Sequence, residues 1–186
     1  MTAAPLLRYH GGKWRIAPWI IGHLPCHAVY VEPFGGAANV LLQKAPAEAE
    51  VYNDLDGEIV NLFRVVRDPE AACRLAESCR LTPYARDELV LANEPAPDEP
   101  IEQARRTLFR AWASFGSAGA TRGKSGFRTY TSPETRYSGV AGSWCRVAPI
   151  IEAVAARFQG VIVENRPALQ VMEQHDSPST LHYVDP

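Results

Sequence analysis

The stretch YVEPFGGAANVLL, residues 30–42, decides the fold of this 186-residue chain. It starts within a β-branched and aromatic run, residues 28–33, that predicts a strand, and residues 34–44 turn on glycines into an expected apolar helix. A strand that ends in an acidic residue, followed by a glycine turn and a helix start, is typical of a dinucleotide or nucleoside site. Glycines admit a ligand to the backbone, and the helix start offers free N–H groups. Alone the pattern is weak, since Gly35 and Gly36 also suit an ordinary tight turn.

A second expected strand, residues 49–54, brings a carboxylate to the same edge of the sheet. Asp54 follows Gly36 by 18 residues, close to the spacing at which an acidic side chain receives the ribose hydroxyls of an adenosine ligand. A carboxylate makes charge-assisted hydrogen bonds to both hydroxyls. Asp54 also suits the N-cap of the following helix, as does Asp56. Nothing in the pattern calls for a pyrophosphate, so an adenosine ligand without phosphates fits at least as well as a dinucleotide.

These two motifs belong to a longer alternation of strands and helices, which predicts parallel strands and right-handed crossovers. We expect an α/β fold with a doubly wound sheet of four strands. The third and fourth strands are expected in GVIVEN, residues 160–165, and LHYVDP, residues 181–186. The core helices are expected at residues 55–68, 143–158 and 167–174.

A helical and loop-rich insertion separates the second strand from the third. Thr82 is expected to cap one helix with Pro83 at its first position, and a second helix opens on Pro100. Glycine, serine and threonine dominate residues 116–142, which predicts a long loop or a short hairpin of functional importance. The expected division is a core of residues 1–68 and 143–186 and an insertion of residues 69–142.

The segment RYHGGKWR, residues 8–15, precedes the first strand. It lacks the GxxxxGK[ST] pattern, so it does not predict a phosphate-binding P-loop. It suits either a solvated N-terminal loop or a lid in which Tyr9 stacks on a flat ligand and Lys13 meets a carboxylate.

Composition and charge limit the class of protein. Hydrophobic residues make up 46%, no apolar run approaches a membrane span, and the four cysteines form no CxxC pair, so we expect a cytoplasmic protein without a metal site or membrane contact. The net charge of −2 hides a contrast, because residues 101–146 hold eight basic and two acidic residues. A solvated helix face accounts for Arg105, Arg106 and Arg110, and the remaining basic residues favour a polyanion-binding segment.

Five motifs, in order, resemble those of the Dam-type, D12-class adenine-N6 DNA methyltransferases. They are RYHGGK, VEPFGGAANVLL, YNDLDGEIVNLF, VIVENRPALQVM and HYVDP, and the resemblance runs from about Leu7 to Pro186. It implies a Rossmann-like methyltransferase sheet, S-adenosylmethionine (SAM) as cofactor, and double-stranded DNA as substrate. It also implies that the insertion is the target recognition region. The chain departs from the family at Tyr9, often tryptophan, and at Ala38, which replaces the second loop glycine.

The resemblance also implies residue roles. The implied SAM contacts are Tyr9, Lys13, Phe34, Gly36, Asp54 and Asp185. Family members read Asp-Pro-Pro-Tyr in the last motif, and this chain supplies Asp185 and Pro186, so we interpret the sequence as ending within the catalytic motif, before further elements of the sheet.

The last motif is where the chemistry is expected. The exocyclic amine of adenine is a poor nucleophile, because its lone pair is delocalised into the ring. A carboxylate and a backbone carbonyl that accept its two N–H groups expose this lone pair to the methyl group of SAM. The base must first leave the duplex.

In the insertion we expect Arg122, Lys124 and Arg128 to contact DNA backbone or base edges, beside Phe127 and Tyr130. Three alternatives remain open. One is a SAM- or DNA-binding fragment without catalysis, and another is an RNA methyltransferase that shares the SAM half. The third, a nicotinamide-dependent oxidoreductase, is disfavoured because no full GxGxxG is present.

Overall fold

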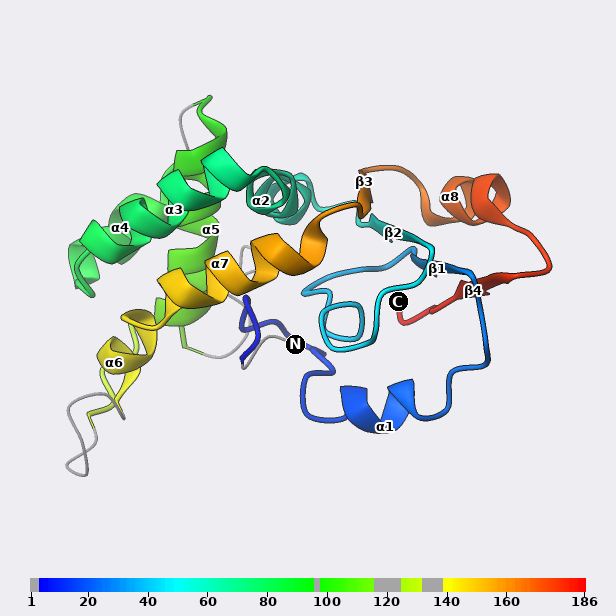
Figure 1. Ribbon diagram of the computed structural model, residues 1–186. Coiled ribbons are helices and arrows are strands. Elements are labelled where there is room, and N and C mark those ends of the chain that lie inside the picture. Colours follow the sequence, from blue (N-terminus) through cyan, green and yellow to red (C-terminus); the bar gives the residue numbers. More distant parts are fainter. Residues whose placement is uncertain (1–3, 96–97, 116–124, 132–138) are drawn as a thin grey trace.

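The computed structural model describes residues 4–95, 98–115, 125–131 and 139–186 (Figure 1). No helix within these residues is long and apolar enough to cross a membrane. The elements, in chain order, are α1 (Ala17–Ile21), β1 (Val29–Glu32), β2 (Ala49–Asn53), α2 (Gly57–Arg67), α3 (Pro69–Leu81), α4 (Arg86–Asn93), α5 (Pro100–Ala113), α6 (Val140–Trp144), α7 (Val147–Phe158), β3 (Ile162–Glu164), α8 (Ala168–His175) and β4 (Thr180–His182).

The four strands form one parallel sheet in the order β3-β2-β1-β4. Val31 of β1 is in register with Val51 of β2 and with His182 of β4. The expected α/β fold with four parallel strands is therefore confirmed. Because all strands run the same way, their carboxyl ends meet at one edge, where parallel sheets bind ligands.

Helices cover both faces of the sheet, because side chains alternate along each strand. Tyr30 and Tyr52 point into the large core that also holds the buried faces of α2, α3, α5 and α7. Val31 and Val51 point to the opposite face, where Val171 of α8 covers them. Figure 1 shows α8 on one side of the strands and the helices α2 to α7 gathered on the other. The sheet is thus doubly wound.

Residues 33–44 form a succession of turns, so the helix expected there is wrong. The Ala38 N–H donates to the Gly35 carbonyl at 2.7 Å, and only single helical turns follow, such as Leu42 N–H to the Ala38 carbonyl at 2.9 Å. Gly36 and Ala38 have φ of 47° and 53°. Two left-handed residues interrupt the i to i−4 ladder that a regular helix needs.

Thr82 ends a helix instead of starting one, which corrects the expected cap. Its backbone N–H and its hydroxyl both donate to the Ser78 carbonyl, at 3.1 and 2.8 Å, at the end of α3. The next helix, α4, begins at Arg86 after Ala85, which makes no side-chain cap. Pro83 favours this break, because a proline disfavours helical geometry in the residue before it.

The solvated helix face expected in α5 is also wrong. Arg105, Arg106 and Arg110 are each less than a tenth exposed. The Arg110 guanidinium contacts the Glu58 carboxylate and donates to the Ala92 carbonyl at 2.6 Å. Helix α5 therefore lies inside the layer of α2, α3 and α4, and its arginines are neutralised internally rather than presented to a polyanion.

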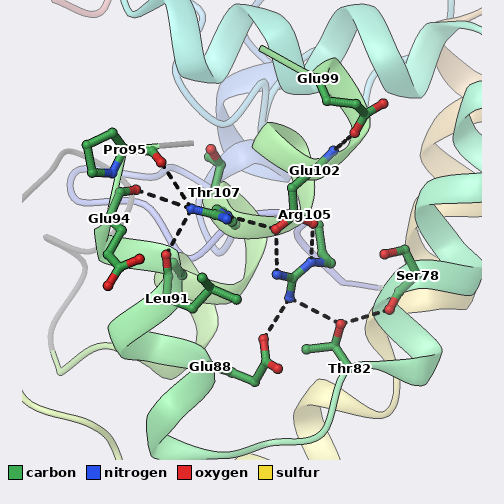
Figure 2. Close-up of polar contacts among 12 residues, drawn as sticks. Ser78, Thr82, Glu88, Leu91, Glu94, Pro95, Glu99, Glu102, Arg105 and Thr107 are labelled. Atoms are coloured by element: carbon green, nitrogen blue, oxygen red, sulfur yellow. Dashed lines mark hydrogen bonds and ion pairs between the residues drawn. The ribbon is translucent and has the colours of Figure 1, made fainter. Parts of the chain in front are cut away.

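Glu102 is the hub of this buried charge cluster (Figure 2). Arg105 forms two bonds to the Glu102 carboxylate, at 2.6 and 2.8 Å, and also reaches Glu88 and Thr82. Arg106 donates to the same carboxylate at 2.7 Å. These hydrogen bonds, the one from Arg105 foremost, lower the pKa of Glu102, so it is charged at neutral pH. One carboxylate therefore orients two buried guanidinium groups.

We expect Glu102→Gln to lower the free energy of unfolding by about 3 kcal/mol at neutral pH, because breaking a buried pair leaves an uncompensated charge. The depressed pKa means that the wild type gains this stability above the ordinary carboxylate range and loses it on acidification. The control is Glu77→Gln, which removes an exposed partner of Arg80 and should cost less than about 1 kcal/mol. Urea denaturation measures both, and equal losses would contradict the prediction.

Candidate functional site

A cavity of about 290 Å³ opens at the carboxyl edge of the sheet. Four segments line it: the N-terminal loop, the turns after β1, the residue after β2, and the chain after β4. The structure brings together in its wall all seven residues that the sequence marks for cofactor binding or catalysis, which are Tyr9, Lys13, Phe34, Gly36, Asp54, Asp185 and Pro186. Their roles remain predictions.

The glycine turn is held between two tyrosine rings. A Cβ on Gly35 would lie 2.2 Å from the ring of Tyr52, so this glycine is needed for close packing on β2. A Cβ on Gly36 would lie 3.0 Å from the ring of Tyr9. The Tyr52 hydroxyl donates to the Gly36 carbonyl at 2.6 Å, which fixes the turn from below. Gly35 is therefore needed for packing against Tyr52, and Gly36 for packing against Tyr9. The sequence pattern alone did not reveal this difference.

Asp54 links the glycine turn to the start of α2. Its two carboxylate oxygens accept from the N–H groups of Gly36 and Asp56, each at 2.8 Å. Of the two cap candidates, Asp56 is the cap, since its side chain accepts from the Glu58 N–H at 2.9 Å. Each oxygen of Asp54 keeps a further lone pair for a ligand at the cavity.

Lys13 and Asp185 form an ion pair across the cavity. The Lys13 Nζ lies 2.7 Å from the Asp185 Oδ2 and also donates to the Gly11 carbonyl at 2.8 Å. The Tyr183 hydroxyl donates to the same carboxylate oxygen at 3.4 Å. Burial, followed by the nearby Asp185 and Glu32, raises the pKa of Tyr183 to about 12, so it stays a donor. The sequence patterns did not predict Tyr183 as a site residue, although it lies in the last of the five motifs.

Glu32 is a second residue that sequence reasoning missed. It borders the cavity at the end of β1 and is 2% exposed. Its Oε1 accepts from the Tyr30 hydroxyl at 2.7 Å and from the Leu41 N–H at 2.8 Å, which fastens the turns to the strand. Burial raises its pKa to about 7, although these two hydrogen bonds oppose the shift. The acidic position was visible in the motif, but its burial was not.

A line of charges continues from Glu32 toward the far end of the strands. The Lys44 Nζ lies 4.4 Å from the centre of the Tyr30 ring and 2.7 Å from the Glu50 carboxylate. Arg157 of α7 binds both oxygens of the Glu50 carboxylate, at 2.6 and 2.9 Å. Glu50 therefore has two cationic partners, whereas Glu32 is bound by neutral donors alone among the described residues.

The residues expected to bind DNA are described only in part. Arg122 and Lys124 lie outside the described residues. The backbone of Arg128 is held by α5 and by the connection between α3 and α4, since its N–H donates to the Ala113 carbonyl at 2.8 Å and its carbonyl accepts from the Tyr84 hydroxyl at 3.0 Å. Phe127 packs on Tyr84 with ring centres 4.9 Å apart, so it belongs to the core rather than to a free stacking surface.

Comparison with known proteins gives the family. The family model for D12 class N6 adenine-specific DNA methyltransferases matches residues 9–186. The chain belongs to this family. A DNA adenine methylase of Serratia marcescens is 33% identical over 61 residues, which are 33% of this chain and 22% of that protein. The resemblance read from the five sequence motifs is therefore confirmed.

Family membership gives the cavity its context. Methyltransferases of this kind generally take their methyl group from SAM, and the matched residues include every segment that lines the cavity. Within the described residues, no three His, Cys, Asp or Glu side chains are placed to hold a metal ion. The polar groups of this D12 methyltransferase's cavity are carboxylates, tyrosines, backbone amides, one lysine, one histidine and the amide of Asn39.

The raised pKa of Glu32 predicts a pH dependence of stability. Its folded form binds a proton more tightly than the unfolded chain, so the wild type loses stability as the pH rises toward and past about 7. Glutamine accepts the same two hydrogen bonds without a charge. From about pH 5 to about pH 8, we expect the unfolding free energy of Glu32→Gln to gain about 2 to 3 kcal/mol relative to the wild type.

Urea denaturation across this pH range measures the difference. Glu48→Gln, at an exposed position just before β2, is the control for the loss of one carboxylate. A difference between Glu32→Gln and the wild type that stays constant with pH would show that Glu32 does not titrate as expected.

Proposed function

We propose that this chain transfers a methyl group from SAM to the N6 amine of adenine in double-stranded DNA. The observation that carries the proposal is the meeting of Gly36, Asp54, Lys13 and Asp185, from four separate segments, in one cavity of a D12-family chain. The parallel order β3-β2-β1-β4, with helices on both faces, supports a Rossmann-like methyltransferase fold.

The residues present fit a SAM molecule. Gly36 lets the ring of Tyr9 approach the turn, since a Cβ would lie 3.0 Å from that ring, and Asp54 offers lone pairs to ribose hydroxyls beside it. Phe34, whose side chain is exposed at the cavity, and Tyr9 provide aromatic surface for the adenine ring. The carboxylates in the wall outnumber the single lysine, which suits a cofactor with a positive sulfonium.

Asp185 is the proposed catalytic group. SAM, when bound, supplies the methyl group, whose bond to sulfur breaks as the bond to N6 forms. The Asp185 carboxylate accepts an N–H of the adenine amine and so holds the lone pair toward the methyl group. The methylated N6 then releases one proton to water, which leaves a neutral secondary amine. Lys13 and Tyr183 orient this carboxylate through the contacts at 2.7 and 3.4 Å. The carbonyl of Pro186, in the same cavity, is the proposed acceptor for the second N–H.

The insertion is the proposed DNA-recognition region. We assign residues 69–142 to it and residues 1–68 and 143–186 to the SAM-binding core. Support comes from the basic residues of the insertion that lie outside α5. Among them, Arg122, Lys124 and Arg128 are the proposed DNA contacts. The burial of Arg105, Arg106 and Arg110 removes them from this surface.

The first test is methyl transfer by the chain itself. Purified protein is incubated with radiolabelled SAM and adenine-containing duplex DNA, and incorporation is measured beside SAM binding by calorimetry. We expect Asp185→Asn to lower the transfer rate by at least about 100-fold, because the neutral amide oxygen accepts the N–H more weakly than a carboxylate and leaves the Lys13 charge without its partner. Asp87→Asn, on the exposed side of α4, is the control and should keep the wild-type rate.

Three outcomes separate the readings. Wild-type transfer with loss in Asp185→Asn supports the proposal. SAM binding without transfer by the wild type would leave a binding protein and overturn catalysis. Transfer to RNA in preference to DNA would overturn the substrate assignment.

The second test concerns the insertion. We expect the triple variant Arg122→Ala, Lys124→Ala, Arg128→Ala to bind duplex DNA more weakly, and to flatten the slope of log affinity against log salt by up to about 3, because each lost phosphate contact contributes about 0.9. Fluorescence anisotropy at several salt concentrations measures this slope. Arg64→Ala, exposed on α2 outside the insertion, is the control, and an unchanged slope in the triple variant would remove the assignment.

A further inference from the structure

Asn39 is buried without hydrogen bonds for its side-chain amide. The residue is 7% exposed, and its Oδ1 is fully buried with no partner. Within the described ranges, its Nδ2 donates no hydrogen bond either, so the finding does not depend on which way the amide is turned. Buried amides in folded proteins nearly always have partners, and leaving one unmade costs stability.

The residue before Asn39 has an unfavourable backbone conformation. Ala38, the preceding residue, is fully buried and has a φ of 53°, a conformation that L-residues with a Cβ rarely adopt. Glycine stands at this position in the resembled family. Adjacent departures from favourable local structure, in a segment that lines a cavity, are characteristic of binding sites.

Asn39 lies where two cavities meet. It lines the 290 Å³ cavity at the sheet edge and a second cavity of about 570 Å³ under the N-terminal segment. Gly12 and Tyr9 line both cavities with it. A Cβ on Gly12 would lie 2.7 Å from the Asn39 Nδ2, so only glycine lets the N-terminal loop close onto this amide.

This position is on the Lys13 side of the glycine turn. Asp54 is bound to the Gly36 N–H, whereas Asn39 contacts the loop that carries Lys13. A SAM molecule with its ribose at Asp54 would therefore extend its amino acid end past Gly36 toward Asn39.

The amide of Asn39 matches one part of SAM in particular. The α-amino acid end carries a carboxylate, which accepts from Nδ2, whereas the Oδ1 is fully buried and out of the ligand's reach. Lys13 is the single lysine or arginine among the described residues that line the smaller cavity, and it is already paired with Asp185. Asp185 and Gly11 take two of the three Lys13 N–H donors, so Asn39 adds a second donor for the ligand carboxylate beside Lys13.

We propose that Asn39 binds the α-amino acid end of SAM, and so determines the affinity for the complete cofactor over its adenosine part. The proposal rests on the proposed function, because it takes SAM as the ligand of this cavity. It adds a contact at a position that the sequence motifs did not mark.

The test compares two ligands that differ in the amino acid end. SAM has it, and 5′-methylthioadenosine lacks it. Isothermal titration calorimetry is run on the wild type, on Asn39→Leu, which keeps the volume without polar atoms, and on Asn39→Ser, which removes bulk and avoids overpacking. We expect both variants to bind SAM about tenfold more weakly or worse, as the loss of one hydrogen bond to a charged group requires, and to bind 5′-methylthioadenosine like the wild type.

A stability measurement excludes a purely structural role. Because Asn39→Leu removes an unsatisfied buried amide, its ligand-free melting temperature should equal or exceed that of the wild type. Asn93→Leu, the same substitution at an exposed position of α4, is the matched control and should bind both ligands normally.

The remaining outcomes overturn the inference in distinct ways. Equal losses for both ligands would place Asn39 at the adenosine part or in the fold of the turn. If the Asn39 variants bound SAM like the wild type but bound DNA more weakly, Asn39 would instead contact the DNA base. A wild type that binds 5′-methylthioadenosine and SAM equally would show that nothing reads the amino acid end. A wild type that binds neither ligand would instead defeat the proposed function itself.

Discussion

The contact between Gly35 and the ring of Tyr52 is the constraint on which the cavity depends. A Cβ would need to lie 2.2 Å from that ring, so the turn after β1 reaches β2 only through a glycine. This closeness lets the Gly35 N–H donate to the Asn53 carbonyl at 2.7 Å and the Gly36 N–H reach Asp54 at 2.8 Å. The end of β2 and the turn then form one surface, against which Tyr9 and the N-terminal loop close.

Alternate side chains of β1 pack against different layers of the molecule. Odd positions face α8 through a small aliphatic contact, and Tyr30 faces the large helical core. The Tyr30 hydroxyl then supports Glu32, which holds the turns through the Leu41 N–H. The helical layer, fixed by its buried arginines, thus positions the cavity indirectly, because a shift of β1 would displace the carboxylate and the turns together.

The sequence was sufficient for the strands, their parallel direction and the residues that gather at the sheet edge, because these follow from short periodic patterns and from motif order. It misplaced residues 34–44, because the alanines and leucines there suit a helix, whereas positive φ values at Gly36 and Ala38 break the ladder. The sequence pattern wrongly predicted that Arg105 is exposed, because its partner Glu88 lies on another helix and is not a neighbour in sequence. Asn39 escaped notice because an unsatisfied amide is defined only by its surroundings.

Under the proposed function, the protein must attract partners of opposite charge at neighbouring places. SAM carries a net positive charge and DNA is a polyanion, so a single field across both sites would repel one of them. The carboxylates of the cavity, including Asp54 and Asp185, outnumber Lys13, which favours the cofactor. Helix α5 lies within the insertion, and its arginines are cancelled by Glu102 and other carboxylates. That cancellation keeps these three arginines from opposing the field of carboxylates that favours SAM, so under the proposed function the contacts with DNA are left to other basic residues of the insertion.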